Sequence, residues 1–120
     1  MNIGIIGLGL IGGSLGRSII RNTECTVFGK DIDKEVIIKA KLLKAINKEL
    51  KEENYKDLDI VFVATNPHVA ADIITEICPK LKDGAVVIDC CGTKEVVVNR
   101  MQELKEEYNN LYFLGGHDPR

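Results

Sequence analysis

The chain has 120 residues, of which 45% are hydrophobic and 28% charged, and its net charge at pH 7 is −2. This length fits one domain with its own hydrophobic core, so we expect residues 1–120 to form a single domain. The slightly acidic balance argues against nucleic acid or an anionic membrane surface as a partner. The first residues also lack the basic segment that opens a secretory signal, so we expect a cytoplasmic protein.

Four cysteines occur, at positions 25, 78, 90 and 91. They form no C-x-x-C pair, and the neighbours Cys90 and Cys91 would point to opposite faces of a strand. We therefore expect reduced thiols and no metal site.

Short apolar runs alternate with segments of helical spacing. In chain order, the sequence predicts a strand at 2–7, a helix at 11–21, a strand at 25–30, a helix from 34 to about 50, a strand at 59–64, a helix carrying Ala70, Ile73, Ile77 and Leu81 on one side, a strand at 85–90, a helix at 94–109 and a strand at 111–116. This alternation predicts the α/β class with a parallel sheet. Right-handed crossovers then predict a Rossmann-type doubly wound sheet, in the order 3-2-1-4-5, with helices on both faces.

A glycine motif lies between the first strand and the first helix. Gly7, Gly9 and Gly12 form the pattern G-x-G-x-x-G, which is informative when it follows a strand and opens a helix. Gly7 would allow a tight turn, Gly9 a close approach to a pyrophosphate, and Gly12 close packing of helix on strand. Backbone N–H groups at the helix N-terminus would face the phosphates. The alternative is a glycine-rich turn without a ligand. The predicted cofactor-binding residues here are Gly7, Leu8, Gly9, Leu10, Ile11 and Gly12.

The second predicted strand ends in an acid. Asp31 follows Gly12 by 19 positions, where a carboxylate can accept hydrogen bonds from the ribose hydroxyls of NAD and repel the 2′-phosphate of NADP. The flanking Lys30 and Lys34 weaken the preference for NAD over NADP. Asp31 could instead cap the following helix, although Asp33 could fill that role equally well.

The third predicted strand ends in the sequence ATNPH. Its loop would lie beside the glycine motif, where ligands bind in such sheets. Ala64 and Thr65 are small enough to let a ribose or pyrophosphate pass, so we predict that Ala64, Thr65 and Asn66 bind the cofactor. An ordinary turn in which Asn66 caps a helix that begins at Pro67 is the alternative.

Five segments together resemble one family. GLGLIGGSLG at 7–16, VFGKDID at 27–33, DIVFVAT at 59–65, VIDCCGTK at 87–94 and FLGGH at 113–117 occur in this order. They are similar to the nucleotide-binding half of prephenate dehydrogenases, a group that includes arogenate dehydrogenases. The resemblance covers almost the whole chain, and the combination with GGH is more specific than the glycine motif.

The resemblance implies an NAD(P)-dependent oxidative decarboxylation of prephenate to 4-hydroxyphenylpyruvate, in tyrosine biosynthesis. It assigns the histidine of GGH, here His117, to hydrogen bonding with the ring hydroxyl and removal of its proton. An imidazole is chemically suited to that task near neutral pH. We also predict that Gly92, in the loop after the fourth predicted strand, binds the cofactor.

Three departures from the family pattern stand out. Gly92 occupies the position where many members carry a serine, and the chain reads GGHDPR instead of GGHPMAG. The helical C-terminal domain, which in the family supplies most of the substrate pocket and the dimer interface, is absent from this sequence. We therefore weigh a truncated enzyme, a degenerate copy and a module that works with a separate chain.

Three functions remain open. The first is the NAD-binding domain of a prephenate dehydrogenase-like enzyme, with a prephenate-like acid as substrate once a C-terminal domain is supplied. The second is a non-catalytic dinucleotide-binding module, and the third is a different dehydrogenase of the same superfamily, acting on a 3-hydroxy acid or an imine. A homo-oligomer is possible in each case.

Overall fold

The computed structural model describes residues 1–90 and 95–115. In chain order the elements are β1 (Asn2–Ile6), α1 (Leu10–Asn22), β2 (Thr26–Lys30), α2 (Lys34–Leu42), β3 (Lys48–Glu49), the 3-10 helix η1 (Glu52–Asp57), β4 (Ile60–Val63), α3 (Pro67–Ile77), the 3-10 helix η2 (Cys78–Lys80), β5 (Val86–Asp89), α4 (Glu95–Glu107) and β6 (Tyr112–Gly115).

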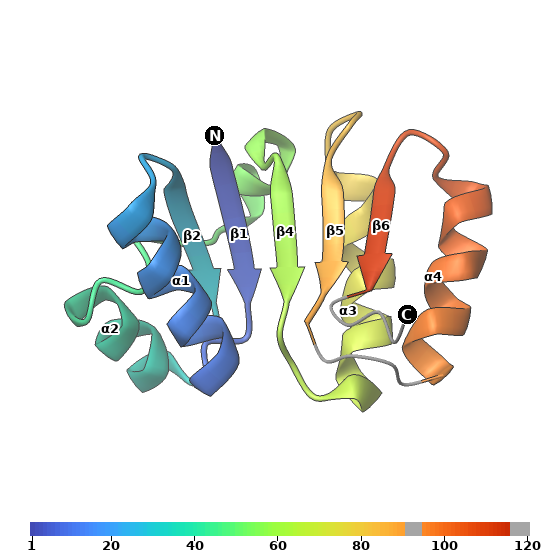
Figure 1. Ribbon diagram of the computed structural model, residues 1–120. Helices are drawn as coiled ribbons and strands as arrows, with labels where there is room; N and C mark the ends of the chain where they lie inside the picture. Colours follow the sequence, from blue (N-terminus) through green and yellow to red (C-terminus); the bar gives the residue numbers. More distant parts are fainter. Residues whose placement is uncertain (91–94, 116–120) are drawn as a thin grey trace.

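The described strands form one parallel sheet in the order β3-β2-β1-β4-β5-β6. The predicted Rossmann-type fold is confirmed. The expected order 3-2-1-4-5 holds once β3, a two-residue strand outside the predicted elements, is counted as the third strand. The predicted strand at 59–64 is then β4, beside β1, and the predicted strand at 111–116 is β6, at the other edge of the sheet. All strands point the same way, so their carboxyl ends lie along one edge (Figure 1).

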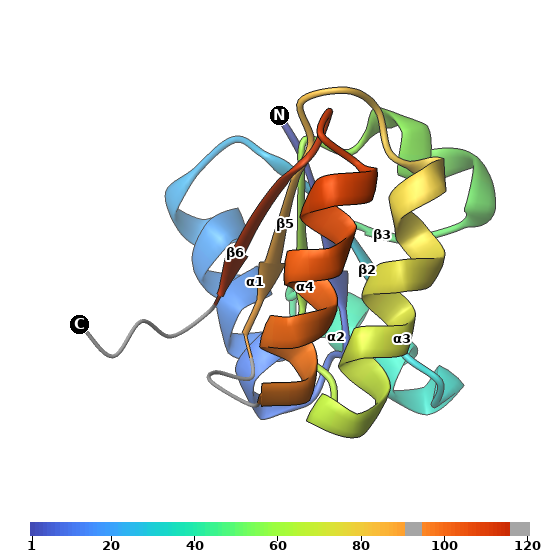
Figure 2. The ribbon, with the colours of Figure 1, turned by 90° about the vertical axis from the view of Figure 1, so that its right-hand side faces the viewer.

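Helices cover both faces of the sheet, but over different strands. α1 and α2 lie on one face beside β1 and β2, whereas α3 and α4 lie on the other face beside β4, β5 and β6 (Figures 1 and 2). Alternating strand residues feed the two cores, because neighbouring side chains in a strand point to opposite faces. Ile3, Ile5 and Val27 belong to the core under α1 and α2, and Val61, Val63 and Val87 to the core under α3 and α4.

The predicted helix from Lys34 to about Leu50 is wrong in its second half. α2 ends at Leu42, and Lys44 adopts a left-handed conformation with φ of 59°. The chain then turns back to bury Ala45 and Ile46 against the sheet. The backbone N–H of Asn47 donates to the Val27 carbonyl at 2.8 Å, and its side-chain oxygen accepts from the Val27 N–H at 2.7 Å. This pairing leads directly into β3, so contacts with β2 override the helical spacing.

Candidate functional site

The first loop of the site is a tight turn at the end of β1. Gly7 has a φ of +98°, a conformation that side-chain-bearing residues rarely adopt. Its N–H donates to the Lys30 carbonyl at 2.8 Å, and a Cβ on Gly7 would lie 2.6 Å from the Ala64 carbonyl oxygen. The turn is therefore held between the ends of β2 and β4, where only glycine fits.

The N-terminus of α1 follows this turn immediately. Gly9 is the N-cap residue, and no side chain caps the helix. A Cβ built on Gly9 would meet no atom within 4 Å, so there is open space at this point. A Cβ on Gly12 would overlap the Gly7 carbonyl oxygen, so α1 packs directly on the turn. Uncapped N–H groups and the helix dipole make this N-terminus suited to a phosphate.

Asp31 lies at the carboxyl end of β2 with both carboxylate oxygens fixed. Its Oδ2 accepts from the Leu8 N–H at 2.8 Å and its Oδ1 from the Asp33 N–H at 3.0 Å. The cap of α2 is Asp33, whose carboxylate accepts from the Glu35 N–H at 2.9 Å. Asp31 is thus not needed as the cap, and the buried Leu8 serves to position it through its backbone.

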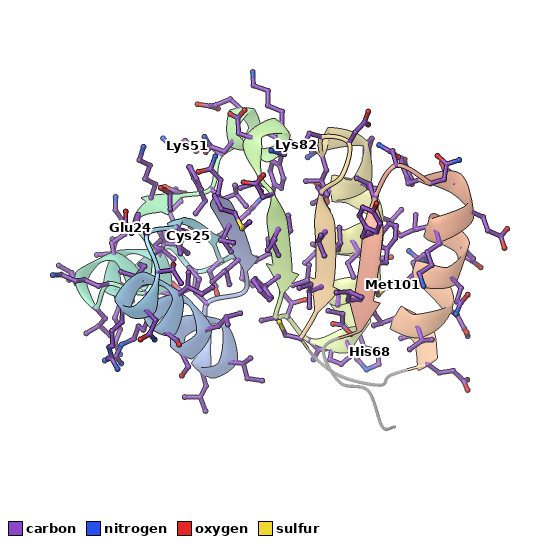
Figure 3. The ribbon with its side chains drawn as sticks, turned by 45° about the horizontal axis from the view of Figure 1, so that its top comes forward. Glu24, Cys25, Lys51, His68, Lys82 and Met101 are labelled. Atoms are coloured by element: carbon purple, nitrogen blue, oxygen red, sulfur yellow. The ribbon has the colours of Figure 1, made fainter. Side chains whose placement is uncertain are left out.

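The third loop joins β4 to α3. Ala64 donates its N–H to the Ile6 carbonyl at 2.8 Å, which holds the loop against the end of β1. Asn66 caps α3 by accepting from the His68 N–H at 2.8 Å, and Pro67 is the first helical residue. His68 therefore lies in the first turn of α3, at the end of the molecule to which the strands point (Figure 3).

These three loops surround a cavity of about 470 Å³, a size typical of small-molecule sites. The predicted site residues that line it are Gly7, Gly9, Asp31, Ala64, Thr65 and Asn66. The other four predicted residues are not among those that line the cavity: Leu8 precedes the N-cap residue of α1, and Leu10, Ile11 and Gly12 form the first turn of this helix. Gly92 and His117 lie outside the described residues.

Sequence reasoning missed the apolar part of this cavity. Ile32, directly after Asp31, is fully exposed, and Val69 is half-exposed on α3. Both line the cavity together with Ile73, one helical turn beyond Val69. The signal that could have found Val69 and Ile73 is their spacing of four residues on the helix that follows the third loop.

A family model described as the nucleotide-binding domain of prephenate dehydrogenase matches residues 15–118. The chain belongs to this family. The match begins just after the glycine turn, so the geometry of residues 7–12 is independent support for a nucleotide-binding site. The match extends through β6.

Solved structures agree with this assignment. Prephenate dehydrogenase from A. aeolicus, in complex with hydroxyphenyl propionate and NAD+, superposes with a TM-score of 0.79 at 25% identity, over 96% of this chain and 40% of that one. Arogenate dehydrogenase from Synechocystis gives a TM-score of 0.79 at 24% identity, over 87% of this chain and 37% of that one. An imine reductase from Myxococcus stipitatus in complex with NADP+ shares the fold, with a TM-score of 0.77 at 14% identity, over 96% of this chain and 40% of that one.

The chain thus spans about 40% of the length of these dehydrogenases.

None of the helices in residues 1–90 and 95–115 combines the length and apolar character that a bilayer crossing needs. In the same part of the chain, no group of three His, Cys, Asp or Glu side chains is placed to hold a metal ion.

Proposed function

We propose that this chain is the NAD-binding part of an enzyme that oxidatively decarboxylates prephenate or a close analogue. The observation that carries the proposal is the cavity that joins the uncapped N-terminus of α1 to Asp31 and the β4–α3 loop. In the proposed complex the phosphates would lie at the N-terminus of α1 and a ribose at Asp31, and the β4–α3 loop would border the ribose or pyrophosphate. Membership of the prephenate dehydrogenase family supports the choice of substrate.

The residues of the chain would bind and orient the cofactor in a definite way. The first-turn N–H groups of α1 would donate to the pyrophosphate in the open space beside Gly9. Asp31, already oriented by the Leu8 N–H, would accept from the ribose hydroxyls. A carboxylate at that position repels a 2′-phosphate, which favours NAD over NADP.

The bound cofactor would supply a hydride acceptor at its nicotinamide ring. Prephenate would give up a hydride from its ring carbon and lose carbon dioxide, yielding 4-hydroxyphenylpyruvate. His117 would accept a hydrogen bond from the ring hydroxyl and take its proton, and Gly92 would lie near the cofactor. Both assignments rest on the family resemblance. A prephenate-like acid would need a substrate-binding region in addition to this domain.

The first experiment measures dissociation constants by calorimetry. We expect NAD+ to bind more tightly than NADP+. In Asp31→Asn, we expect NAD+ binding to weaken about tenfold and the preference over NADP+ to shrink, because hydrogen bonds to a charged acceptor are lost. Asp33→Asn is the matched control, since asparagine caps helices as well as aspartate. Failure of the wild-type protein to bind any dinucleotide would refute the proposal.

The second experiment measures NADH formation from prephenate. If the wild-type protein turns over prephenate and His117→Ala does not, while its affinity for NAD+ is retained, the result would support the proposed dehydrogenase activity. NAD+ binding without turnover, even when a helical substrate domain of the family is supplied, would favour the non-catalytic module instead.

A further inference from the structure

The cavity has a second end, away from the glycine turn. Val69, Ile73 and Glu76 follow one another at intervals of four and three residues, so they lie on one face of α3. All three line the cavity, and Ile32 lines it from the loop after β2. Of the lining residues, Asp31 and Glu76 are the two carboxylates, and they come from different walls.

A cluster of ion pairs centred on Lys80 lies at this end of the cavity. Lys80 pairs with Glu52 at 2.8 Å and with Glu76 Oε2 at 3.6 Å, and its ammonium group lies 5.1 Å from the centre of the Tyr55 ring. The hydrogen bond to Glu52 is the largest cause that raises the pKa of Lys80. Lys80 is therefore anchored mainly by Glu52. Within the described residues, the 3.6 Å contact with Lys80 is the one interaction of the Glu76 carboxylate. Its Oε1 is therefore free to accept a hydrogen bond from another donor.

The proposed function identifies the part of the dinucleotide that would occupy this end of the cavity. If Asp31 binds the ribose, a flat base attached to that ribose enters the space between Ile32 and Val69. The exocyclic amino group of adenine is on the edge of the base remote from the ribose, and it is a hydrogen-bond donor. That edge would face the wall that Glu76 contributes.

We propose that Glu76 is a specificity-determining residue that recognises the adenine amino group and rejects bases with a carbonyl there. This inference rests on the proposed dinucleotide function. A carboxylate accepts but does not donate. It therefore attracts the amino group of adenine and repels the carbonyl oxygen that replaces it in hypoxanthine.

The test compares NAD+ with nicotinamide hypoxanthine dinucleotide, in which a carbonyl replaces this amino group and the adjacent ring nitrogen N1 carries a proton. We expect the wild-type protein to bind NAD+ about fivefold more tightly, a moderate effect because the Glu76 side chain is 66% exposed and solvent weakens the interaction. In Glu76→Gln we expect the ratio to fall to about one, because an amide can both accept and donate.

Glu53→Gln is the matched control, because it removes an exposed carboxylate of η1 that does not line the cavity and makes no ion pair within the described residues. We expect this variant to keep the wild-type ratio. An equal loss of selectivity in both variants would show that the local charge, not direct contact, is responsible, and would overturn the inference.

Two further results are distinguishable. A wild-type ratio near one, together with NAD+ binding that depends on Asp31, would overturn the role of Glu76 and leave the proposed function standing. Absence of binding by both dinucleotides would refute the proposed function, and the inference with it.

Discussion

Individual glycines in the first loop have separate structural tasks. Gly7 has the left-handed backbone that the turn needs, and Gly12 permits α1 to contact that turn. The structure shows both the turn and the close packing that the motif predicts, whereas a phosphate contact at Gly9 stays a prediction. The same loop also orients Asp31, through the Leu8 N–H.

The packing role of Gly12 can be separated from helix propensity. In Gly12→Ala the new Cβ would overlap the Gly7 carbonyl oxygen, so we expect the free energy of unfolding to fall by about 2 kcal/mol. A Cβ at Gly13 would lie 3.6 Å from the Leu8 carbonyl oxygen, an ordinary contact. Gly13→Ala should therefore raise the free energy of unfolding by about 0.5–1 kcal/mol. Urea denaturation measures both, and a similar change in the two variants would contradict this account.

At the scale of elements, the segment after α2 shows how tertiary contacts override a local pattern. The apolar residues of 34–50 repeat with helical spacing, yet the helix stops at Leu42. Ala45 and Ile46 are buried and Asn47 pairs with Val27 on β2. Continuing the helix would have left these residues without the sheet contacts that they make.

The left-handed residue at this helix end can be tested directly. Lys44 has a φ of 59°, which costs a residue with a side chain more than it costs glycine. We expect Lys44→Gly to raise the free energy of unfolding by about 0.5–1 kcal/mol. Lys41→Gly, within α2, should lower it by about 1 kcal/mol. Thermal and urea unfolding would check both signs, and destabilisation by Lys44→Gly would disprove the explanation.

At the scale of the whole molecule, the two faces of the sheet are covered unequally. Ile60, Val86 and Tyr112 are paired across β4, β5 and β6, and so are Phe62, Ile88 and Leu114, so these side chains share one face. α3 and α4 lie on the opposite face of these strands (Figure 2). Tyr112 is 64% exposed and Leu114 54% exposed on the edge strand.

This exposed apolar face leads to a prediction about association. Exposed apolar patches and unpaired edge strands promote contacts between molecules. We expect the protein to associate as its concentration rises, and Leu114→Lys to reduce that association without changing the free energy of unfolding by more than about 0.5 kcal/mol. Sedimentation equilibrium would measure it. Ile38→Lys, at an exposed position on α2, is the control, and an equal effect there would contradict a role for the β6 face.

The sequence by itself determined the alternation of strands and helices, the glycine turn and the acid at the end of β2. Each of these depends on residues close together in the chain, through hydrophobic period or the conformational freedom of glycine. The tertiary structure decided where α2 ends, which of Asp31 and Asp33 caps it, and how the cavity is walled. Ile32 and Val69 lie 37 positions apart in the sequence and meet at one cavity only because β1 brings the ends of β2 and β4 together. Contacts of that kind follow from the order of the strands, which no local pattern contains.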